Sequence, residues 1–232
     1  MDTSKKYQGK FFSILGDSIS TFEGLSTPKY AEYYDVEKKI LSEVTTYQDT
    51  WWGQVIQALG GKLLVNDSIS GSTVTYHVSY TYDSYGCSEG RANALALSDV
   101  SPDVIMIYMG TNDWGRGVAV TGISKDEKNL RVFSNAYQKM IDNLKERYKD
   151  AEIWCFTLSK SIWSKNEHFV FRENYSGYRI EDYCKTIEKI AEKNGCVLID
   201  LLSGEPYDTI DGYHPNKAGM KTIAKNVLKN II

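Results

Sequence analysis

Residues 11–18 read Phe-Phe-Ser-Ile-Leu-Gly-Asp-Ser, an apolar run that ends in small and polar residues. A short apolar run of this kind suits a strand that is buried on both faces of a parallel sheet. Four later runs have the same character, namely Lys62–Val65, Asp103–Tyr108, Glu152–Phe156 and Cys196–Asp200. Longer segments with helical periodicity separate them. This alternation predicts an α/β fold in which helices cover a central parallel sheet of about five strands.

The segments between these runs carry apolar residues at three- and four-residue steps. About 20 residues from Asp126 are predicted to form one helix, and a second stripe from Ile180 ends before Gly195, a suitable left-handed cap. A shorter helix is expected around Trp51–Leu59. The last helix is expected to begin at Pro215, because a first-turn position does not need an N–H group.

Length and charge limit the classes of function. No repeat or linker divides the 232 residues, so we expect a single domain, 1–232. The formal net charge of −3 gives no basic face for nucleic acid. We find neither an apolar leader nor a run of the roughly 18 apolar residues that a spanning helix needs. We therefore expect no membrane partner and a cytoplasmic location, or secretion if a leader was removed. The oligomeric state stays open.

Polar residues follow three of the predicted strands. Gly16-Asp17-Ser18 follows the first, Gly71 lies after the second, and Asn112 follows the third within Met109-Gly110-Thr111-Asn112-Asp113. The carboxyl ends of parallel strands share one edge of the sheet, where ligands bind. A serine hydroxyl, a closely approaching backbone N–H and a side-chain amide would meet there. Each segment alone is equally typical of a turn.

The fourth segment is Asp211-Gly212-Tyr213-His214, just before the last predicted helix. A carboxylate three residues before a histidine can fold back onto the imidazole, fix its tautomer and stabilise the imidazolium that forms when it takes a proton. The other histidines, His77 and His168, show no metal-ligand spacing with His214. We expect no metal ion and no cofactor.

Together the four segments resemble the SGNH hydrolases, also called the GDSL esterase and lipase family. The resemblance spans nearly the whole chain and implies a flavodoxin-like three-layer α/β/α sandwich. It implies Ser18 as nucleophile, His214 as base and Asp211 as the orienting carboxylate. The oxyanion hole would comprise the Ser18 and Gly71 backbone N–H groups and the Asn112 amide. An α/β-hydrolase is disfavoured, because the sequence has no Gly-x-Ser-x-Gly elbow.

Two long, tyrosine-rich segments, residues 20–49 and 72–90, are expected to line the crevice. We assign substrate binding to four residues, Asp17, Tyr76, Asp113 and Trp114. Three arginines are weighed as anion-binding groups but favoured as solvated, Arg91, Arg116 and Arg172. Flat amphipathic rings stack on sugars, which favours a small-molecule or oligosaccharide ester as substrate. The same segments contain few Leu, Ile or Phe residues, which favours a short-chain acyl esterase that acts on acetyl groups. The alternatives are a lipase or thioesterase with the same catalytic residues, or a sugar-binding protein that does not catalyse.

Overall fold

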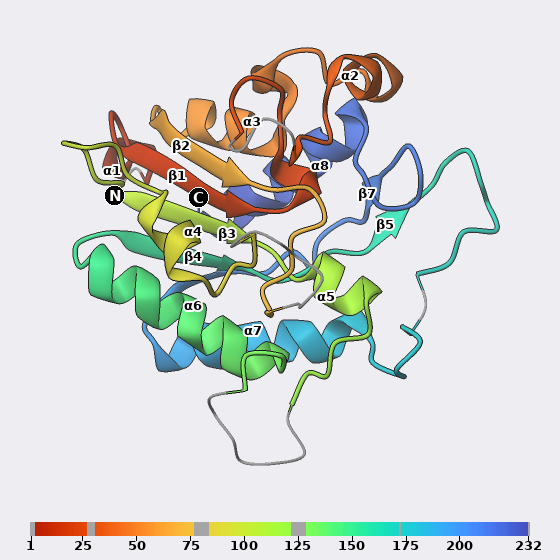
Figure 1. Cartoon of the computed structure of the whole chain (residues 1–232). Helices are drawn as coiled ribbons and strands as arrows, with labels where there is room; N and C mark the ends of the chain where they lie inside the picture. Colours follow the sequence, from red (N-terminus) through yellow and green to blue (C-terminus); the bar gives the residue numbers. More distant parts are fainter. Residues whose placement is uncertain (1–2, 27–30, 77–83, 122–128, 172, 232) are drawn as a thin grey trace.

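The computed structural model describes residues 3–26, 31–76, 84–121, 129–171 and 173–231. Its main sheet contains five parallel strands in the order β2-β1-β3-β4-β6 (Figure 1). They are β1 (Phe11–Gly16), β2 (Lys62–Ser68), β3 (Val104–Tyr108), β4 (Glu152–Phe156) and β6 (Val197–Ile199). The predicted α/β class with a five-stranded parallel sheet is confirmed. The largest difference is at β2, which continues beyond Val65 to Ser68.

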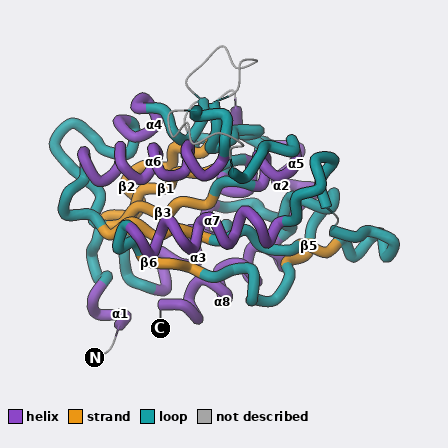
Figure 2. Tube along the Cα trace, turned by 90° about the horizontal axis from the view of Figure 1, so that it is seen from below, coloured by secondary structure: helices purple, strands orange, loops and turns teal. Residues whose placement is uncertain are grey.

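Helices cover both faces of the sheet (Figures 1 and 2). One face packs against α3 (Trp51–Ala58) and α8 (Lys217–Ile231), and the other against α4 (Glu89–Asn93), α6 (Phe133–Arg147) and α7 (Ile180–Lys193). This confirms the three-layer sandwich. The remaining short elements are α1 (Thr3–Lys6), η1 (Ser18–Ser20), α2 (Val36–Ser42), η3 (Tyr47–Asp49), α5 (Thr111–Gly115), β5 (Ser161–Ile162) and β7 (Tyr207–Asp208).

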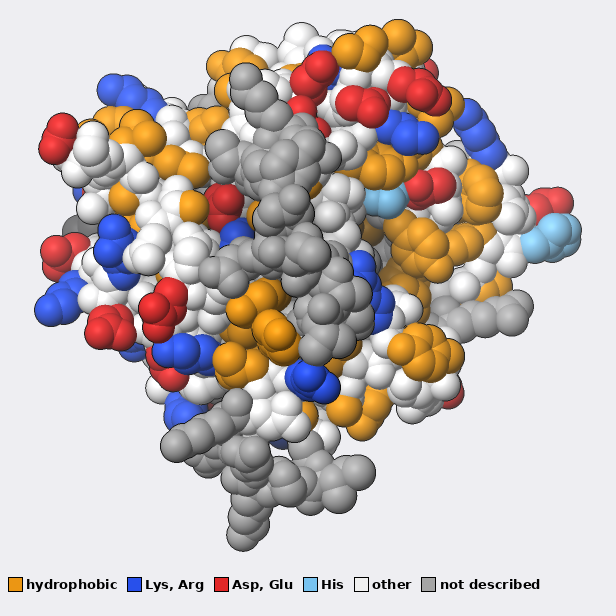
Figure 3. Space-filling view, in the orientation of Figure 1, with side chains coloured by type: hydrophobic (Ala, Val, Ile, Leu, Met, Phe, Trp, Pro, Cys, Tyr) orange, Lys and Arg blue, Asp and Glu red, His pale blue; other side chains and the backbone are white. Residues whose placement is uncertain are grey.

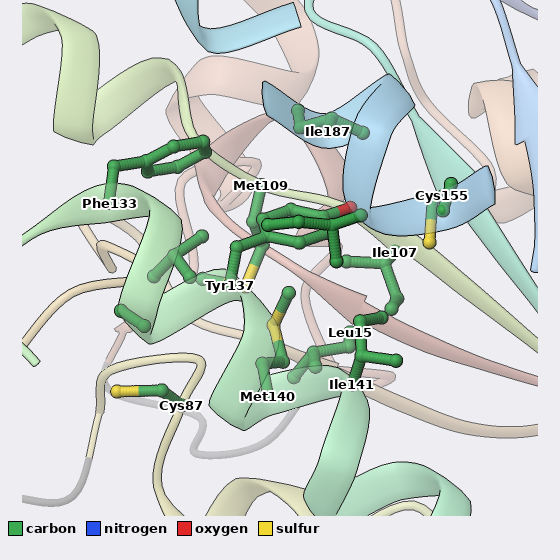
Figure 4. Packing of buried hydrophobic residues seen from close by; sticks show 14 of the residues in the cluster. Leu15, Cys87, Ile107, Met109, Phe133, Tyr137, Met140, Ile141, Cys155 and Ile187 are labelled. Atoms are coloured by element: carbon green, nitrogen blue, oxygen red, sulfur yellow. The ribbon is translucent and has the colours of Figure 1, made fainter. Parts of the chain in front are cut away.

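Two hydrophobic clusters, one on each face, hold the layers together. Side chains alternate along a strand, so Leu15 of β1 packs toward α6 and α7, whereas Ile14 packs toward α3 and α8. In the first cluster Tyr137, Met140 and Ile141 of α6 lie against strand residues (Figure 4). Burial on both faces explains why the strand runs are apolar throughout.

The helix predicted from Asp126 begins instead at Phe133; residues 122–128 lie outside the described ranges. The N–H groups of Phe133 and Ser134 donate to the carbonyls of Ala119 and Val120, at 2.9 and 3.0 Å. A tertiary contact therefore satisfies the first-turn donors and sets the start of the helix.

The last helix was predicted to begin at Pro215, but it begins at Lys217. The Asn216 side-chain oxygen accepts the N–H of Gly219 at 2.9 Å, as a helix N-cap does. Pro215 instead forms an isolated bridge with Thr209.

The parallel pair β5 and β7 was not predicted. It lies beyond the carboxyl end of β4, where it supports the turn before α8 (Figure 1). No helix in the described part of the chain is both long and apolar enough to cross a membrane.

Candidate active site

Ser18 lies immediately beyond the carboxyl end of β1. A Cβ atom at Gly16 would lie 2.5 Å from the Ser68 hydroxyl and 2.7 Å from the Ser20 Cβ, so a larger residue would force these side chains to move. The Asp17 side chain then accepts the N–H of Ile19 at 3.0 Å and starts the short 3₁₀ helix η1. This turn places the mostly buried Ser18 side chain at the edge of the sheet.

The turn from Asp211 to His214, here called the base turn, folds the carboxylate onto the imidazole. Asp211 Oδ1 accepts the backbone N–H groups of Tyr213 and His214 at 3.0 and 2.8 Å, while Gly212 takes a φ of +96°. Asp211 Oδ2 lies 2.7 Å from His214 Nδ1, and His214 Nε2 lies 2.9 Å from Ser18 Oγ. The three predicted catalytic residues thus form one hydrogen-bonded series.

Burial raises the pKa of Asp211, but hydrogen bonds from the side chain and backbone of His214 outweigh it and hold this pKa well below its usual range. A further donor is Tyr33, whose hydroxyl lies 2.8 Å from Asp211 Oδ2. The Tyr33 ring also stacks on the imidazole, with centroids 3.5 Å apart and planes 10° apart. The sequence placed Tyr33 only in a segment expected to line the crevice and did not predict these contacts.

The other two predicted oxyanion residues, Gly71 and Asn112, follow β2 and β3. Asn112, in the first turn of α5, donates its amide to the Ser72 carbonyl at 2.9 Å and lies 3.4 Å from Asp17 Oδ2. Gly71 takes a φ of +75°, and its carbonyl accepts Nη2 of Arg116 at 3.0 Å. Asn112 and Arg116 line the same cleft as Ser18, whereas Gly71 is not part of that lining.

Asp17 and Asp113, assigned above to substrate binding, are buried and lie outside the lining of the cleft. Asp113 accepts the N–H of Val74 at 2.8 Å, and the N–H and hydroxyl of Thr75 at 3.1 and 2.7 Å. It therefore fixes the loop after β2 against α5. Burial raises the pKa of Asp17 to about 7 and that of Asp113 to about 6.

Arg91, favoured above as a solvated residue, is buried and paired with Asp67. Its guanidinium also donates to the Gly16 and Asp67 carbonyls, at 3.0 and 2.6 Å, and to the Ser72 hydroxyl at 2.8 Å. Arg91 therefore joins the carboxyl ends of β1 and β2 to Ser72 in the loop after β2. Arg172 lies outside the described residues.

A cleft of about 550 Å³ opens beside Ser18. Its lining comprises Ser18, Ile19, Thr111, Asn112, Trp114, Gly115, Arg116, Phe169, Val170, Phe171, Glu173, Asn174, Tyr213 and His214. Trp114 stacks on Phe171 with centroids 4.5 Å apart, and Phe169 meets Tyr213 edge-on at 5.9 Å. On the face of the molecule that Figure 3 shows, a histidine side chain lies beside hydrophobic side chains. Trp114 is thus the one proposed substrate-binding residue that lines this cleft.

The other walls differ from those expected. Tyr76 lies outside the lining and packs edge-on against Tyr85, with centroids 5.0 Å apart. Phe169 and Phe171, which were not predicted from the sequence, line the cleft instead. The sequence feature that could have predicted these two residues is the long, aromatic stretch before the helix at Ile180. Segments 20–49 and 72–90 were predicted to line the crevice on the same ground, namely that long loops are usually functional.

No group of three or more histidine, cysteine, aspartate or glutamate side chains gathers as metal ligands would among the described residues. His168 is exposed, and His77 lies outside the described ranges.

The chain resembles known proteins in sequence and in fold. The family model for GDSL-like lipase/acylhydrolase matches residues 10–231. The structure resembles that of a chain described as a GDSL-like lipase from Bacteroides ovatus, with a TM-score of 0.73, 26% identity, and 96% of this chain and 97% of that chain covered. For a similarly described chain from Bacteroides uniformis the TM-score is 0.71, the identity 28% and the coverage 96% and 95%.

A carbohydrate acetylesterase family member from Sinorhizobium meliloti shares the fold, with a TM-score of 0.61, 16% identity and 94% of each chain covered. A search of curated proteins finds no match.

Proposed function

Because the chain belongs to the GDSL-like lipase/acylhydrolase family, we propose that it is a serine esterase that removes short acyl groups, acetyl above all, from a carbohydrate alcohol. Ser18 is the proposed nucleophile, His214 the general base and Asp211 its orienting carboxylate. The observation that carries the proposal is the series of contacts of 2.7 Å, Asp211 Oδ2 to His214 Nδ1, and 2.9 Å, His214 Nε2 to Ser18 Oγ. A nucleophile, a base and an orienting group within such reach are the signature of an activated hydroxyl.

In the proposed acylation step, Ser18 Oγ attacks the ester carbonyl carbon while its proton moves to His214 Nε2. The tetrahedral intermediate collapses, the bond to the alcohol oxygen breaks, and the alcohol leaves with the proton from His214. Water then attacks the acyl carbon, His214 takes a proton from it, and the same proton returns to Ser18 Oγ as the acid leaves.

The developing oxyanion is proposed to bind the backbone N–H groups of Ser18 and Gly71 and the amide of Asn112. One Asn112 N–H is engaged by the Ser72 carbonyl at 2.9 Å. The second contact, to Asp17 Oδ2 at 3.4 Å, is long and weak, so a substrate oxygen can replace it. Donors fixed before the reaction stabilise the transition state more than they stabilise the substrate.

The lining of the cleft supports a small acyl group and a sugar. The stacked pair Trp114 and Phe171 offers flat apolar surface of the kind that binds sugar rings. Arg116 and Asn174 supply polar groups beside it, whereas Ile19 and Val170 are the aliphatic side chains of the described lining. A long acyl chain needs a larger aliphatic surface. We also propose that the chain acts as one domain, 1–232, since its sheet draws strands from residues 11 to 199.

The test combines Ser18→Ala with a substrate screen. We expect the parent enzyme to release acetate from acetylated sugars, to favour the shortest aryl esters and to react rapidly with a fluorophosphonate probe, and the variant to do none of these. Equal hydrolysis by Ser18→Ala would exclude the assigned nucleophile. A preference for long acyl chains or for thioesters would indicate the lipase or thioesterase alternative. Sugar binding without hydrolysis would indicate a protein that does not catalyse.

A further inference from the structure

Tyr33 contacts two members of the proposed catalytic series at once. Its ring lies face to face with the His214 imidazole, with centroids 3.5 Å and planes 10° apart. Its hydroxyl donates to Asp211 Oδ2 at 2.8 Å, and His214 Nδ1 lies 2.7 Å from the same oxygen. The Tyr33 side chain therefore contacts both the face of the His214 imidazole and the Asp211 oxygen to which the imidazole is hydrogen-bonded.

The backbone around Tyr33 is tied to both ends of the series. Its N–H donates to Thr21 Oγ1 at 2.9 Å, and the Thr21 hydroxyl donates to the Ser18 carbonyl at 3.0 Å. The next residue, Tyr34, is buried and donates its hydroxyl to the Pro215 carbonyl at 2.7 Å. The segment that carries Tyr33 thus joins the turn of Ser18 to the residue that follows His214.

We infer that Tyr33 is a positioning residue that keeps the His214 imidazole aligned between Asp211 and Ser18. The inference rests on the proposed function, because it assumes that His214 carries the proton. The stack restricts rotation of the imidazole out of its plane, and the face of the phenol ring also attracts the imidazolium that forms during acylation. The hydroxyl holds Asp211 Oδ2 in place while the imidazole moves its proton. Tyr33 itself need not touch the reacting atoms.

Two variants separate the ring from the hydroxyl. Tyr33→Phe keeps the stack and removes the hydrogen bond to Asp211, while Tyr33→Leu removes both. Misplacement of a catalytic group by about 1 Å costs up to about 100-fold, so we expect kcat on an aryl acetate to fall about tenfold or more for Tyr33→Leu and about threefold for Tyr33→Phe. KM should stay within about twofold in both, because binding of the substrate is not the step that changes.

Tyr7→Phe is the matched control. The Tyr7 hydroxyl also donates to a carboxylate, Glu152 Oε2 at 3.0 Å, but it lies away from the cleft. A proton NMR spectrum adds a readout that a general loss of packing would not move. The downfield signal of the His214 Nδ1 proton should shift in Tyr33→Phe, broaden in Tyr33→Leu and stay unchanged in Tyr7→Phe.

The outcomes separate this inference from the proposed function. If both Tyr33 variants keep the parent kcat and the parent NMR signal while Ser18→Ala is inactive, Tyr33 has no positioning role and the proposed function stands. A rise in KM alone would make Tyr33 a wall of the cleft instead and overturn the inference. If Ser18→Ala stays active, the proposed function fails. Tyr33→Phe keeps the packed ring, so it decides the question even if Tyr33→Leu does not fold.

Discussion

The proposed base side of the candidate site, Asp211 and His214, and its proposed oxyanion side, Asn112 with the buried residues Asp113 and Arg91, are held in different ways. On the base side, the Asp211 and His214 side chains are 39% and 19% exposed and are fixed largely by each other and by Tyr33. On the oxyanion side, Asp113 and Arg91 are 0% and 3% exposed and bond to backbone groups of the loop after β2 and of the end of β1. Substitutions on the base side should therefore change the rate, whereas those behind the oxyanion side should also change the free energy of unfolding.

His214→Ala tests the base side with the largest expected effect. Loss of the base should lower kcat on the order of 10⁴–10⁶-fold. The free energy of unfolding should change by less than about 1 kcal/mol, because the residue lies in a partly exposed turn. Initial rates on an aryl acetate and urea unfolding measure the two quantities. His168→Ala, at an exposed histidine, is the control and should change neither. A large loss of stability in His214→Ala would remove the contrast between the two sides.

Arg91→Met tests the buried support of the oxyanion side. The substitution removes the buried cation that is paired with Asp67, so the free energy of unfolding should fall by about 3–5 kcal/mol. Arg179→Met is the control, because its ion pair with Glu173 is exposed and should contribute less than about 1 kcal/mol. Equal urea midpoints for the two variants would show that the buried pair does not carry the stability assigned to it.

Asn112→Ala combines both kinds of effect. Loss of one oxyanion donor should lower kcat about 10²–10³-fold, and loss of the hydrogen bond to Ser72 should cost about 1 kcal/mol of stability. Asn143→Ala removes a comparable amide bond, to the Cys87 carbonyl at 3.1 Å, far from the cleft lining. It should lower stability and keep kcat. If Asn112→Ala raised only KM, its amide would bind substrate rather than the oxyanion.

Asp17, which is buried beside Ser18, should make the free energy of unfolding depend on pH. Burial raises the pKa of Asp17 to about 7, so the folded state binds its proton more tightly than the unfolded chain does. This contribution is fully present below about pH 4 and is lost as the pH rises toward 7 and above, a decrease of about 2–3 kcal/mol between pH 5 and 8. Asp211, whose pKa is lowered, stays ionised throughout that range.

Urea unfolding at pH 5 and pH 8 measures this decrease. Asp17→Asn keeps an acceptor for the Ile19 N–H and removes the titrating group, so it should weaken the pH dependence. An unchanged decrease in Asp17→Asn would assign it to other groups, of which Asp113, with a pKa of about 6, is the first to test.

The sequence predicted much of the fold and the meeting of Ser18, Asp211 and His214. Strands buried on both faces leave continuous apolar runs, and the carboxyl ends of parallel strands must share one edge. The order and direction of the strands therefore determine where a residue such as Ser18, at the end of a strand, lies in the fold. The catalytic roles themselves stay predictions until they are tested.

The sequence did not predict what surrounds these residues. Asp113 was predicted to bind substrate, but its carboxylate accepts backbone N–H groups of a loop 38 and 39 residues earlier. The stack of Tyr33 on His214 and the wall supplied by Phe171 are likewise contacts between distant loops. The periodic spacing of apolar residues in the sequence does not predict such contacts, because they depend on the conformations of loops, which have no repeating backbone structure.

The hydrogen bond between Ser18 and His214 joins residues 196 positions apart. During synthesis on the ribosome, the first strand and its serine leave the exit tunnel long before the histidine is translated. The nascent chain therefore carries the Ser18 hydroxyl without its His214 partner until the residues before α8 emerge. Hydrolysis of a fluorogenic ester by stalled chains of increasing length would then switch on late, and enzymatic turnover would serve as a timer of vectorial folding.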